Sequence, residues 1–458
     1  MKQLFMSGDS VINHALRESF EPFIELFRTR LNTTRYTSFS LLIYLVTAAS
    51  YRSSFTFAFN HLKSYGISID GIKIENKKIE LPPLYKLSEY MKKISIPDAT
   101  AAINQALKQQ VMLAVSYGWT EHFNILIADA HEIPAWNRAH TELIVPIYSA
   151  KKANSKGFRY FTSVVGDGRW WLTTAFYIDG PAGSPYDIDE AYVASNSFKR
   201  AHILGFKIRY GLFDSRFFTV DTIRELTYHN YPFLMIASKN SRVKDAVLSG
   251  HRTLCGHYEP MVVPMEIGSG RSKVTYNLLV APRPKEKRVI KPKNRPGDIL
   301  SNYVTLATNM DAFGGCSVMN AVITMGKKGI RAAIKQWVME KAEFDYRRRA
   351  NIEVGYKIQE QVRARTNTRN NALRVLLFGM MVVLYNLHVL LKMYSELGAI
   401  KRVRVAYLQV PDLRIWRFKK LIENWLLISY AVLSLEASGE RVRMHKYLRT
   451  KLKVVLIL

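Results

Sequence analysis

Three carboxylic acids, Asp129, Asp214 and Glu353, stand in sequence contexts from which they could hold divalent metal ions. Asp129 ends the apolar run 124–129 and Asp214 ends the more mixed run 206–214, so we expect each at the end of a strand. Glu353 lies among six cationic side chains of one predicted helix. Carboxylate oxygens are the ligands that Mg²⁺ and Mn²⁺ prefer, and two such ions about 4 Å apart can activate a water or a 3′-hydroxyl for attack on phosphorus. These residue types predict phosphodiester hydrolysis and transesterification.

The helix that carries Glu353 is predicted to run over residues 341–365, because no Pro and no Gly other than Gly355 interrupts them. In such a helix Arg349 and Glu353 lie one turn apart on the same face, with Tyr346 one turn before. A solvent-exposed helix with ordinary ion pairs would show the same charge pattern. The acid is therefore either neutralised by ion pairs or placed to bind a cation beside a polyanion.

The two aspartates need a sheet to bring them together. After Asp214 the chain is predicted to form a helix over 215–226 and a strand over 231–237. A strand, helix and strand in this order normally make a parallel pair with a right-handed crossover. Sites in open α/β sheets lie beyond the carboxyl ends of the strands, which is where we expect Asp129 and Asp214.

The order of the three acids, together with a Tyr-x-x-Arg-x-x-x-Glu arrangement over residues 346–353, resembles the DDE transposases of bacterial and archaeal insertion sequences. More narrowly, it is similar to the group with a Tyr-Arg-Glu-Lys signature at the third acid and a β-rich insertion in a ribonuclease-H-like core. The resemblance extends over residues 120–395 and is strongest over 346–391. It implies a metal-dependent enzyme that cleaves DNA at the ends of a mobile element and transfers the strand to target DNA.

The resemblance also assigns roles to individual residues. Asp129, Asp214 and Glu353 match the catalytic acids, which would hold Mg²⁺ or Mn²⁺ as two ions. Tyr346 and Arg349 match the signature residues that would contact the DNA backbone. The residues expected to position DNA are Tyr346, Arg349, Lys357, Arg363, Arg365 and Arg369.

The signature departs from the family pattern at two positions, and at one of them Ala350 stands where relatives commonly have a Trp after the signature Arg. At the other, the signature Lys is expected seven residues after the third acid, where this chain has Glu360. Lys357 or Arg363, one turn to either side, could reach the same phosphate. The departure at Glu360 favours an alternative in which the chain binds DNA as a transposase-derived protein without catalysis. A further alternative is a nuclease of the same fold that hydrolyses DNA without strand transfer.

The fold class predicted is α/β, a ribonuclease-H-like mixed sheet with flanking helices, interrupted by a β-rich insertion and preceded by a helical N-terminal region. Between the second and third acids lie too many residues for the short connection of a minimal core of this kind. The predicted parts are a helical region at 1–115, the first part of the core at 116–239, the insertion at 240–312, the second part of the core at 313–395, and a basic region at 396–458.

Local patterns support the N-terminal region and the insertion. Segments 38–49 and 54–63 are predicted helices, each with a serine as its N-cap. They could recognise DNA ends or serve only as packing helices. Strands are predicted at 261–267, 273–280 and 303–308 in the insertion.

The formal charge of the chain is +29, far more than solubility requires, and it points to a polyanion such as DNA. The excess is concentrated in residues 347–458, which hold 22 Lys and Arg against 7 Asp and Glu. Double-stranded DNA, as element ends and as target, is therefore the predicted partner. Synapsis of two ends would require a dimer.

A reducing cytoplasm is the expected location, because the two cysteines, Cys255 and Cys316, have no paired or metal-type spacing. The 17 uncharged residues 375–391 reach the lower limit of a membrane span, but Asn386 and His388 within them would be costly in lipid. We expect a helix buried against the catalytic sheet and no membrane partner.

Several other residues near the predicted site could contribute. On a continuing strand His131 would share a face with Asp129, where it could bind metal or phosphate or support the site indirectly. The indole rings of Trp136, Trp170 and Trp171 could stack on bases or fill the core. Alternative carboxylates are Glu132, Asp187, Asp189, Asp221 and Glu225.

Overall fold

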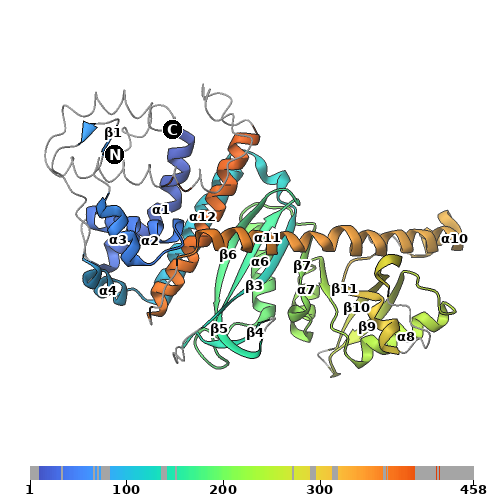
Figure 1. Cartoon of the computed structure of the whole chain (residues 1–458). Coiled ribbons are helices and arrows are strands. Elements are labelled where there is room, and N and C mark those ends of the chain that lie inside the picture. Colours follow the sequence, from blue (N-terminus) through green and yellow to red (C-terminus); the bar gives the residue numbers. More distant parts are fainter. Residues whose placement is uncertain are drawn as a thin grey trace.

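A mixed sheet of nine strands lies at the centre of the molecule, with helices on both faces (Figure 1). This computed structural model describes residues 10–397 together with Lys419 and Ile422, apart from 32–34, 65–67, 70–71, 74–82, 136–141, 150–151, 271–272, 289–295, 312–317, 365–367 and 369. The strands of the sheet are β3 (Ile125–Pro134), β4 (Val145–Ser149), β5 (Lys152–Gly166), β6 (Trp171–Asp179), β7 (Tyr210–Phe213), β8 (Phe233–Ile236), β9 (Met261–Ile267), β10 (Val274–Pro282) and β11 (Tyr303–Thr308). A separate pair is formed by β1 (Ser68–Ile69) and β2 (Ile72–Lys73).

Five strands in the order β6-β5-β3-β7-β8 form the core of this sheet. The β3/β5 and β5/β6 pairs are antiparallel, whereas the β3/β7 and β7/β8 pairs are parallel. Three antiparallel strands followed by two parallel ones are the arrangement of a ribonuclease-H-like sheet, so the predicted fold class is confirmed.

The predicted strand, helix and strand after the second acid are present, with shifted bounds. Instead of one helix directly after Asp214, a short 3₁₀ turn η2 (Ser215–Phe217) precedes α7 (Val220–Tyr228). Thr219 causes this break, because its extended backbone and its hydroxyl, which accepts from the Thr222 amide, begin α7 anew. The parallel pairing of β7 with β8 follows as expected.

The three strands predicted for the insertion are also present. They extend the same sheet, since β11 pairs antiparallel with β8 and is followed by β10 and β9. Helices α8 (Ser241–Thr253) and α9 (Pro296–Ser301) complete this part of the molecule, seen on the right of Figure 1. The boundaries 240–312 stay a prediction, because the strands are continuous with the core.

A long helical run crosses one face of the sheet (Figure 1). It starts with α10 (Val318–Met339), passes through the π segment η5 (Glu340–Asp345) and the 3₁₀ turn η6 (Tyr346–Arg349), and continues as α11 (Ala350–Gln359) and the 3₁₀ turn η7 (Glu360–Val362). The single regular helix predicted over 341–365 is therefore wrong in two respects. The run changes its winding three times before Glu353, and it ends at Val362 because Arg363 has an extended backbone.

The opposite face of the sheet packs on α6 (Glu190–Ile203) and α7, and the two faces have separate cores. Ile125 and Ile127 of β3 pack with Ile352 and Tyr356 beneath α11. Leu126 and Ala128 belong to the larger core that contains the buried side of α6. Because successive side chains of β3 point to opposite faces of the sheet, only those on the face of Ile125 and Ile127 can contact α11.

The N-terminal region is helical, as predicted. Its helices are α1 (Ser10–Leu31), α2 (Arg35–Ser50), α3 (Phe55–Ser64), α4 (Leu84–Lys92) and α5 (Ile96–Ser116). Ser54 caps α3 as expected, whereas Ser38 is no cap because α2 begins at Arg35. Residues 40–50 of α2 are all buried, so this part of the helix packs against the rest of the protein.

The apolar segment 375–391 lies in α12 (Asn371–Glu396), which is buried as predicted. Within the described chain it is the helix long and apolar enough to cross a membrane, and nearly all of it is covered by the rest of the protein. Gly379 lets α5 approach closely, because a Cβ at this position would lie 2.0 Å from Cδ1 of Ile103. The basic region 396–458 lies almost wholly outside the described residues.

Two asparagines close the outer edge of β6, the strand at the end of the core order. Asn386 of α12 accepts from the amide of Thr173 at 2.8 Å and donates to its carbonyl at 2.8 Å. Asn104 of α5 accepts from the amide of Phe176 at 3.0 Å and donates to its carbonyl at 2.8 Å. A β-bulge in the β5/β6 pairing lies between the two contacts, and it explains how residues three apart both face outward.

Candidate active site

Asp129 lies in the middle of β3, so the prediction that the strand ends at this residue is wrong. β3 continues to Pro134 because its pairing with the long strand β5 runs unbroken from Ile125 to Pro134. The parallel pairing with β7 is shorter and ends with Ile127 opposite Leu212. Asp129 therefore lies beyond the last parallel pair and remains at the carboxyl end of β7, 5% exposed.

Asp214 directly follows the four buried residues of β7, as predicted. The register that places Ile127 opposite Leu212 puts Asp214 level with Asp129. One oxygen of its carboxylate accepts from the Arg216 amide at 2.9 Å and caps the turn η2. The other oxygen faces the centre of the site.

Glu353 reaches the same place from α11, and Arg349 connects the three acids. Arg349 Nη2 donates to Asp129 Oδ2 at 3.0 Å and lies 3.8 Å from Asp214 Oδ2, while Nη1 lies 3.2 Å from Glu353 Oε1. The predicted trio is thus brought together around one guanidinium group. Arg349 and Glu353 are one helical turn apart, as the spacing predicts.

Two tyrosine hydroxyls fasten the helical run to the strands that carry the aspartates. Tyr346 donates to the carbonyl of Phe213, the residue before Asp214, at 3.0 Å. Tyr356 donates to the carbonyl of Asp129 at 3.1 Å and contacts the hydroxyl of Thr162 at 2.7 Å. Sequence analysis missed this role of Tyr356; its only signal was a tyrosine on the same helix face as Ile352.

Burial gives Asp129 an unusual protonation equilibrium. Loss of hydration raises the pKa of its carboxyl group to about 6, the charge of Arg349 opposes this rise, and the charges of Asp214 and Glu353 add to it. A cation that replaced lost hydration would favour the ionised carboxylate. The pKa therefore reflects a buried carboxyl group whose lost hydration is not offset by the charge of Arg349.

A buried ion pair lies just before Tyr346, inside the π segment η5. Lys341 Nζ donates to Asp345 Oδ2 at 2.6 Å, and the hydroxyl of Tyr210 donates to Asp345 Oδ1 at 2.8 Å. Both charged residues are buried. Because Tyr210 belongs to β7 and Asp345 precedes Tyr346, these contacts fix where the helix meets the strand. These residues were not identified from the sequence, since the contact of Asp345 with Tyr210 joins segments that lie 135 residues apart in the chain.

Glu360, which occupies the position of the signature Lys, has partners of its own. Its Oε1 lies 3.1 Å from Nε2 of His131 and its Oε2 lies 3.0 Å from Nε of Arg363. Burial raises the pKa of Glu360, but the hydrogen bond to His131 and the charge of Arg363 outweigh it and lower the pKa overall. His131 shares the Asp129 face, as the continuing strand allows, and stacks edge-on against Tyr356 with 4.7 Å between ring centroids. It contacts Glu360 instead of the three acids.

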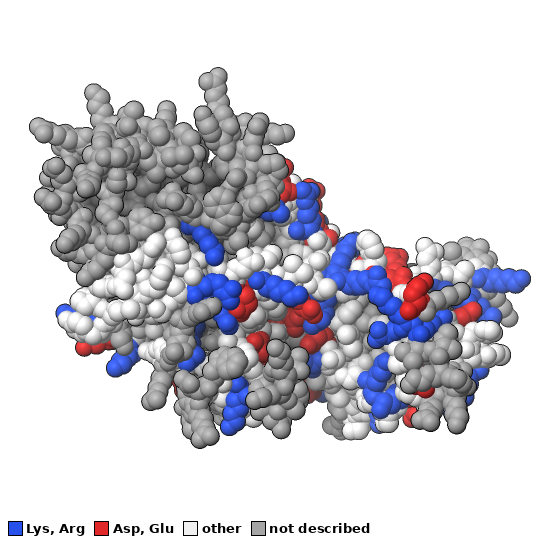
Figure 2. Space-filling view, viewed as in Figure 1, with Lys and Arg blue, Asp and Glu red and all other residues white. Residues whose placement is uncertain are grey.

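Basic side chains gather along the run from α10 to α11 on the face seen in Figure 2. Of the residues predicted to position DNA, Lys357 is exposed on this run and Arg363 is partly exposed beside Glu360. Arg365 and Arg369 lie outside the described residues. The exposed surface next to the three acids is thus basic, with acidic side chains between the cations.

The alternative carboxylates have other partners. Glu132 pairs with Arg159 and Arg216, Asp187 accepts from the Gly183 amide, Asp189 caps α6, Asp221 pairs with Arg224, and Glu225 contacts Ser195 and His229. Trp170 and Trp171 are buried, whereas Trp136 lies outside the described residues. These contacts favour the original trio.

As they stand, no three Asp, Glu, His or Cys side chains in the described chain are close enough to share a metal ion. The guanidinium of Arg349 lies between the acids and keeps their oxygens apart. The donor set itself fits a hard cation, because three carboxylates converge on one positive charge at a partly open position. Side chains of Glu353 and Asp214 are 56% and 27% exposed.

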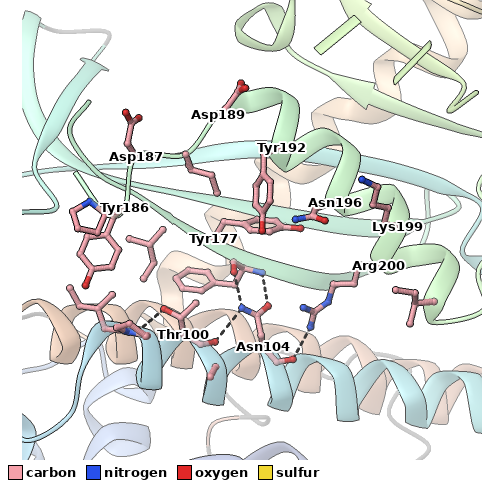
Figure 3. A pocket seen from close by; sticks show the side chains of 18 residues that line it. Thr100, Asn104, Tyr177, Tyr186, Asp187, Asp189, Tyr192, Asn196, Lys199 and Arg200 are labelled. Atoms are coloured by element: carbon pink, nitrogen blue, oxygen red, sulfur yellow. Dashed lines mark hydrogen bonds between the residues drawn. The ribbon is translucent and has the colours of Figure 1, made fainter. Parts of the chain in front are cut away.

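A separate cavity of about 950 Å³ lies between α5, the end of β6 and α6 (Figure 3). Tyr177, Tyr186 and Tyr192 line it, and Arg200 at its floor donates to the carbonyl of Asn104 at 2.9 Å. Because α6 covers the face of the sheet opposite α11, this cavity is not part of the acid cluster.

Neither a protein-family model nor a curated protein sequence matches the chain. Among solved structures, the chain is similar to the cryo-EM structure of a piggyBac transposase synaptic complex with hairpin DNA. The TM-score is 0.52 and the sequence identity 11%, over 96% of this chain and 84% of that one. At this identity the similarity concerns the fold, and the chain has a transposase-like fold.

Proposed function

We propose that the chain is a DDE transposase, which cleaves DNA at the ends of an insertion sequence and transfers the strands to target DNA. The observation that carries the proposal is the convergence of Asp129, Asp214 and Glu353 on one cation at the carboxyl end of β7. Ligand sites of open α/β sheets lie at this position. The transposase-like fold supports the proposal independently of the residue pattern.

Asp129, Asp214 and Glu353 would hold Mg²⁺ or Mn²⁺. Such ions, when bound, lower the pKa of a coordinated water or hydroxyl and offset charge on the phosphate. The protein's own contribution is positioning. Tyr346 and Tyr356 fix α11 against β7 and β3, so that Glu353 cannot drift from the aspartates.

DNA would lie along the basic surface of the helical run, with Lys357 and Arg363 as phosphate contacts near the acids. Phosphate contacts position a duplex without reading its sequence, and they make binding salt-dependent. We propose a homodimer as the form that joins two element ends. Glu360 is compatible with this surface because it contacts the imidazole of His131 and Arg363 offsets its charge.

The test is cleavage and joining of DNA that carries the sequences flanking the gene, with Mg²⁺ or Mn²⁺, by the wild-type chain and by Glu353→Gln. We expect nicked and joined products from the wild type and a loss of more than about 100-fold in the variant, since a metal ligand is removed. Glu343→Gln is the matched control, because Glu343 is an exposed acid of the same helical run. Activity in Glu353→Gln equal to that of the control would remove the third acid from the proposal.

The same assay separates the two alternatives. Nicking without joined product would identify a nuclease of this fold. Binding of the flanking ends without cleavage by any form would leave a DNA-binding protein derived from a transposase.

A further inference from the structure

Arg349 is the shared partner of all three acids. A single Nη2 atom serves Asp129 and Asp214, and Nη1 serves Glu353. One guanidinium carries one positive charge, whereas the three ionised carboxylates carry three negative charges. The cluster therefore keeps a deficit of positive charge even with Arg349 in place.

A divalent cation and this guanidinium would compete for the same oxygens. Hard cations require direct contact with carboxylate oxygens, and Asp129 Oδ2 is the oxygen to which Arg349 donates at 3.0 Å. Its other oxygen, Oδ1, accepts from the backbone amide of Ala130 at 2.8 Å. Each oxygen keeps a second lone pair, but a cation shared by the three acids would need the space that the guanidinium occupies, and this side-chain partner is the one that can move.

The ion pairs of Arg349 with the acids are made by its Nη atoms. Its Nε is buried without a hydrogen-bond partner among the described residues. Its backbone belongs to the short turn η6, directly beside the exposed Arg347 and the basic surface of the helical run. A side chain released from the acids would find the phosphates of a DNA backbone within this basic surface.

We propose that Arg349 is an internal counter-ion that a divalent cation displaces, and that the released arginine then binds the DNA backbone. This inference rests on the proposed function. Its consequence is that metal and DNA bind with positive coupling, because each favours the state in which Arg349 has left the acids. Such coupling is reciprocal and typically amounts to a factor of about 5 to 150 in affinity.

The first experiment measures Mn²⁺ binding calorimetrically in the absence of DNA. We expect Arg349→Ala to bind Mn²⁺ about 10-fold more tightly than the wild type, because no internal cation has to be displaced. Arg347→Ala removes the same charge two residues earlier without touching the acids, and we expect it to change the affinity less than about twofold. Equal affinities of wild type and Arg349→Ala would overturn the proposal.

The second experiment uses thermal unfolding and distinguishes a counter-ion from an ordinary structural contact. In EDTA, Arg349→Ala should unfold at a lower temperature than the wild type, because three carboxylates are left without a cation. Saturating Mn²⁺ should remove most of this deficit, since the metal takes over the same role. A deficit that persists in Mn²⁺ would contradict displacement. Arg349→Gln, which keeps much of the side-chain length, replaces the alanine variant if that variant fails to fold.

The third experiment measures the affinity for an end-carrying duplex with and without Ca²⁺. We expect the ion to strengthen DNA binding about 10-fold in the wild type and distinctly less in Arg349→Ala, which lacks the released arginine. An equal gain in both would overturn the DNA half of the proposal. Absence of Mn²⁺ binding in the wild type and in both variants would overturn the metal site of the proposed function itself, and this inference with it.

Discussion

Two charge clusters lie two residues apart along β3, and they differ in balance. At Asp129, three acids share one arginine; at His131, the single acid Glu360 contacts both an imidazole and Arg363. The first cluster has unmet negative charge, and burial raises the pKa of its central acid to about 6. In the second, the partners lower the pKa of Glu360. The difference indicates that only the first needs a further cation, which is the property expected of a metal site.

The largest expected effect is the dependence of the free energy of unfolding on pH that Asp129, in the first cluster, causes. The folded-state pKa of Asp129, about 6, exceeds its ordinary value, so its contribution to stability is full below about pH 4 and is lost as the pH rises to 6. Asp129→Asn does not titrate. In EDTA, its free energy of unfolding relative to wild type should therefore rise by up to about 3 kcal/mol between pH 4 and pH 7.

Urea unfolding across this pH range measures the difference. Asp221→Asn serves as control, because Asp221 is an exposed aspartate of α7 whose carboxylate pairs with Arg224. If the difference between Asp129→Asn and wild type is the same at both pH values, the pKa of Asp129 is not raised and the contrast between the two clusters fails.

A smaller effect is expected from the balanced cluster. Glu360→Gln keeps the shape of the side chain but removes its charge from His131 and Arg363, and we expect it to lower the free energy of unfolding by about 1 kcal/mol. Mn²⁺ binding should stay within about twofold of the wild type, because the contacts of Glu360 do not include the three acids. Mn²⁺ binding weakened as strongly as in Glu353→Gln would show that the two clusters act as one.

The smallest effect concerns the surface between the clusters, where Lys357 is exposed on α11. Lys357→Ala should leave stability and Mn²⁺ binding unchanged and weaken DNA binding equally for all sequences. The slope of log affinity against log salt concentration should fall by about 1, the value for one phosphate contact. Lys108→Ala, at an exposed lysine of α5, is the control, and an equal change there would exclude a specific role of Lys357.

Local signals and the family resemblance together predicted the fold class, and they predicted that the three acids lie close together. The apolar runs before Asp129 and Asp214 mark neighbouring strands, and the spacing of Arg349 and Glu353 is a helical turn. What these signals missed depends on contacts between distant segments. β3 continues past Asp129 because of its pairing with β5, and the irregular winding before Glu353 accompanies the buried contact of Asp345 with Tyr210. No local pattern encodes either feature.

The two asparagines that bind the edge of β6 have a consequence for how copies of the chain can meet. An unpaired strand edge is a template on which another chain can add a strand, and such contacts lead to aggregation. The carboxamides of Asn104 and Asn386 take the place of a neighbouring peptide at Phe176 and Thr173. An incoming strand would have to dislodge α5 and α12 first. The β6 edge of the central sheet is thus closed to strand addition by another copy of the chain.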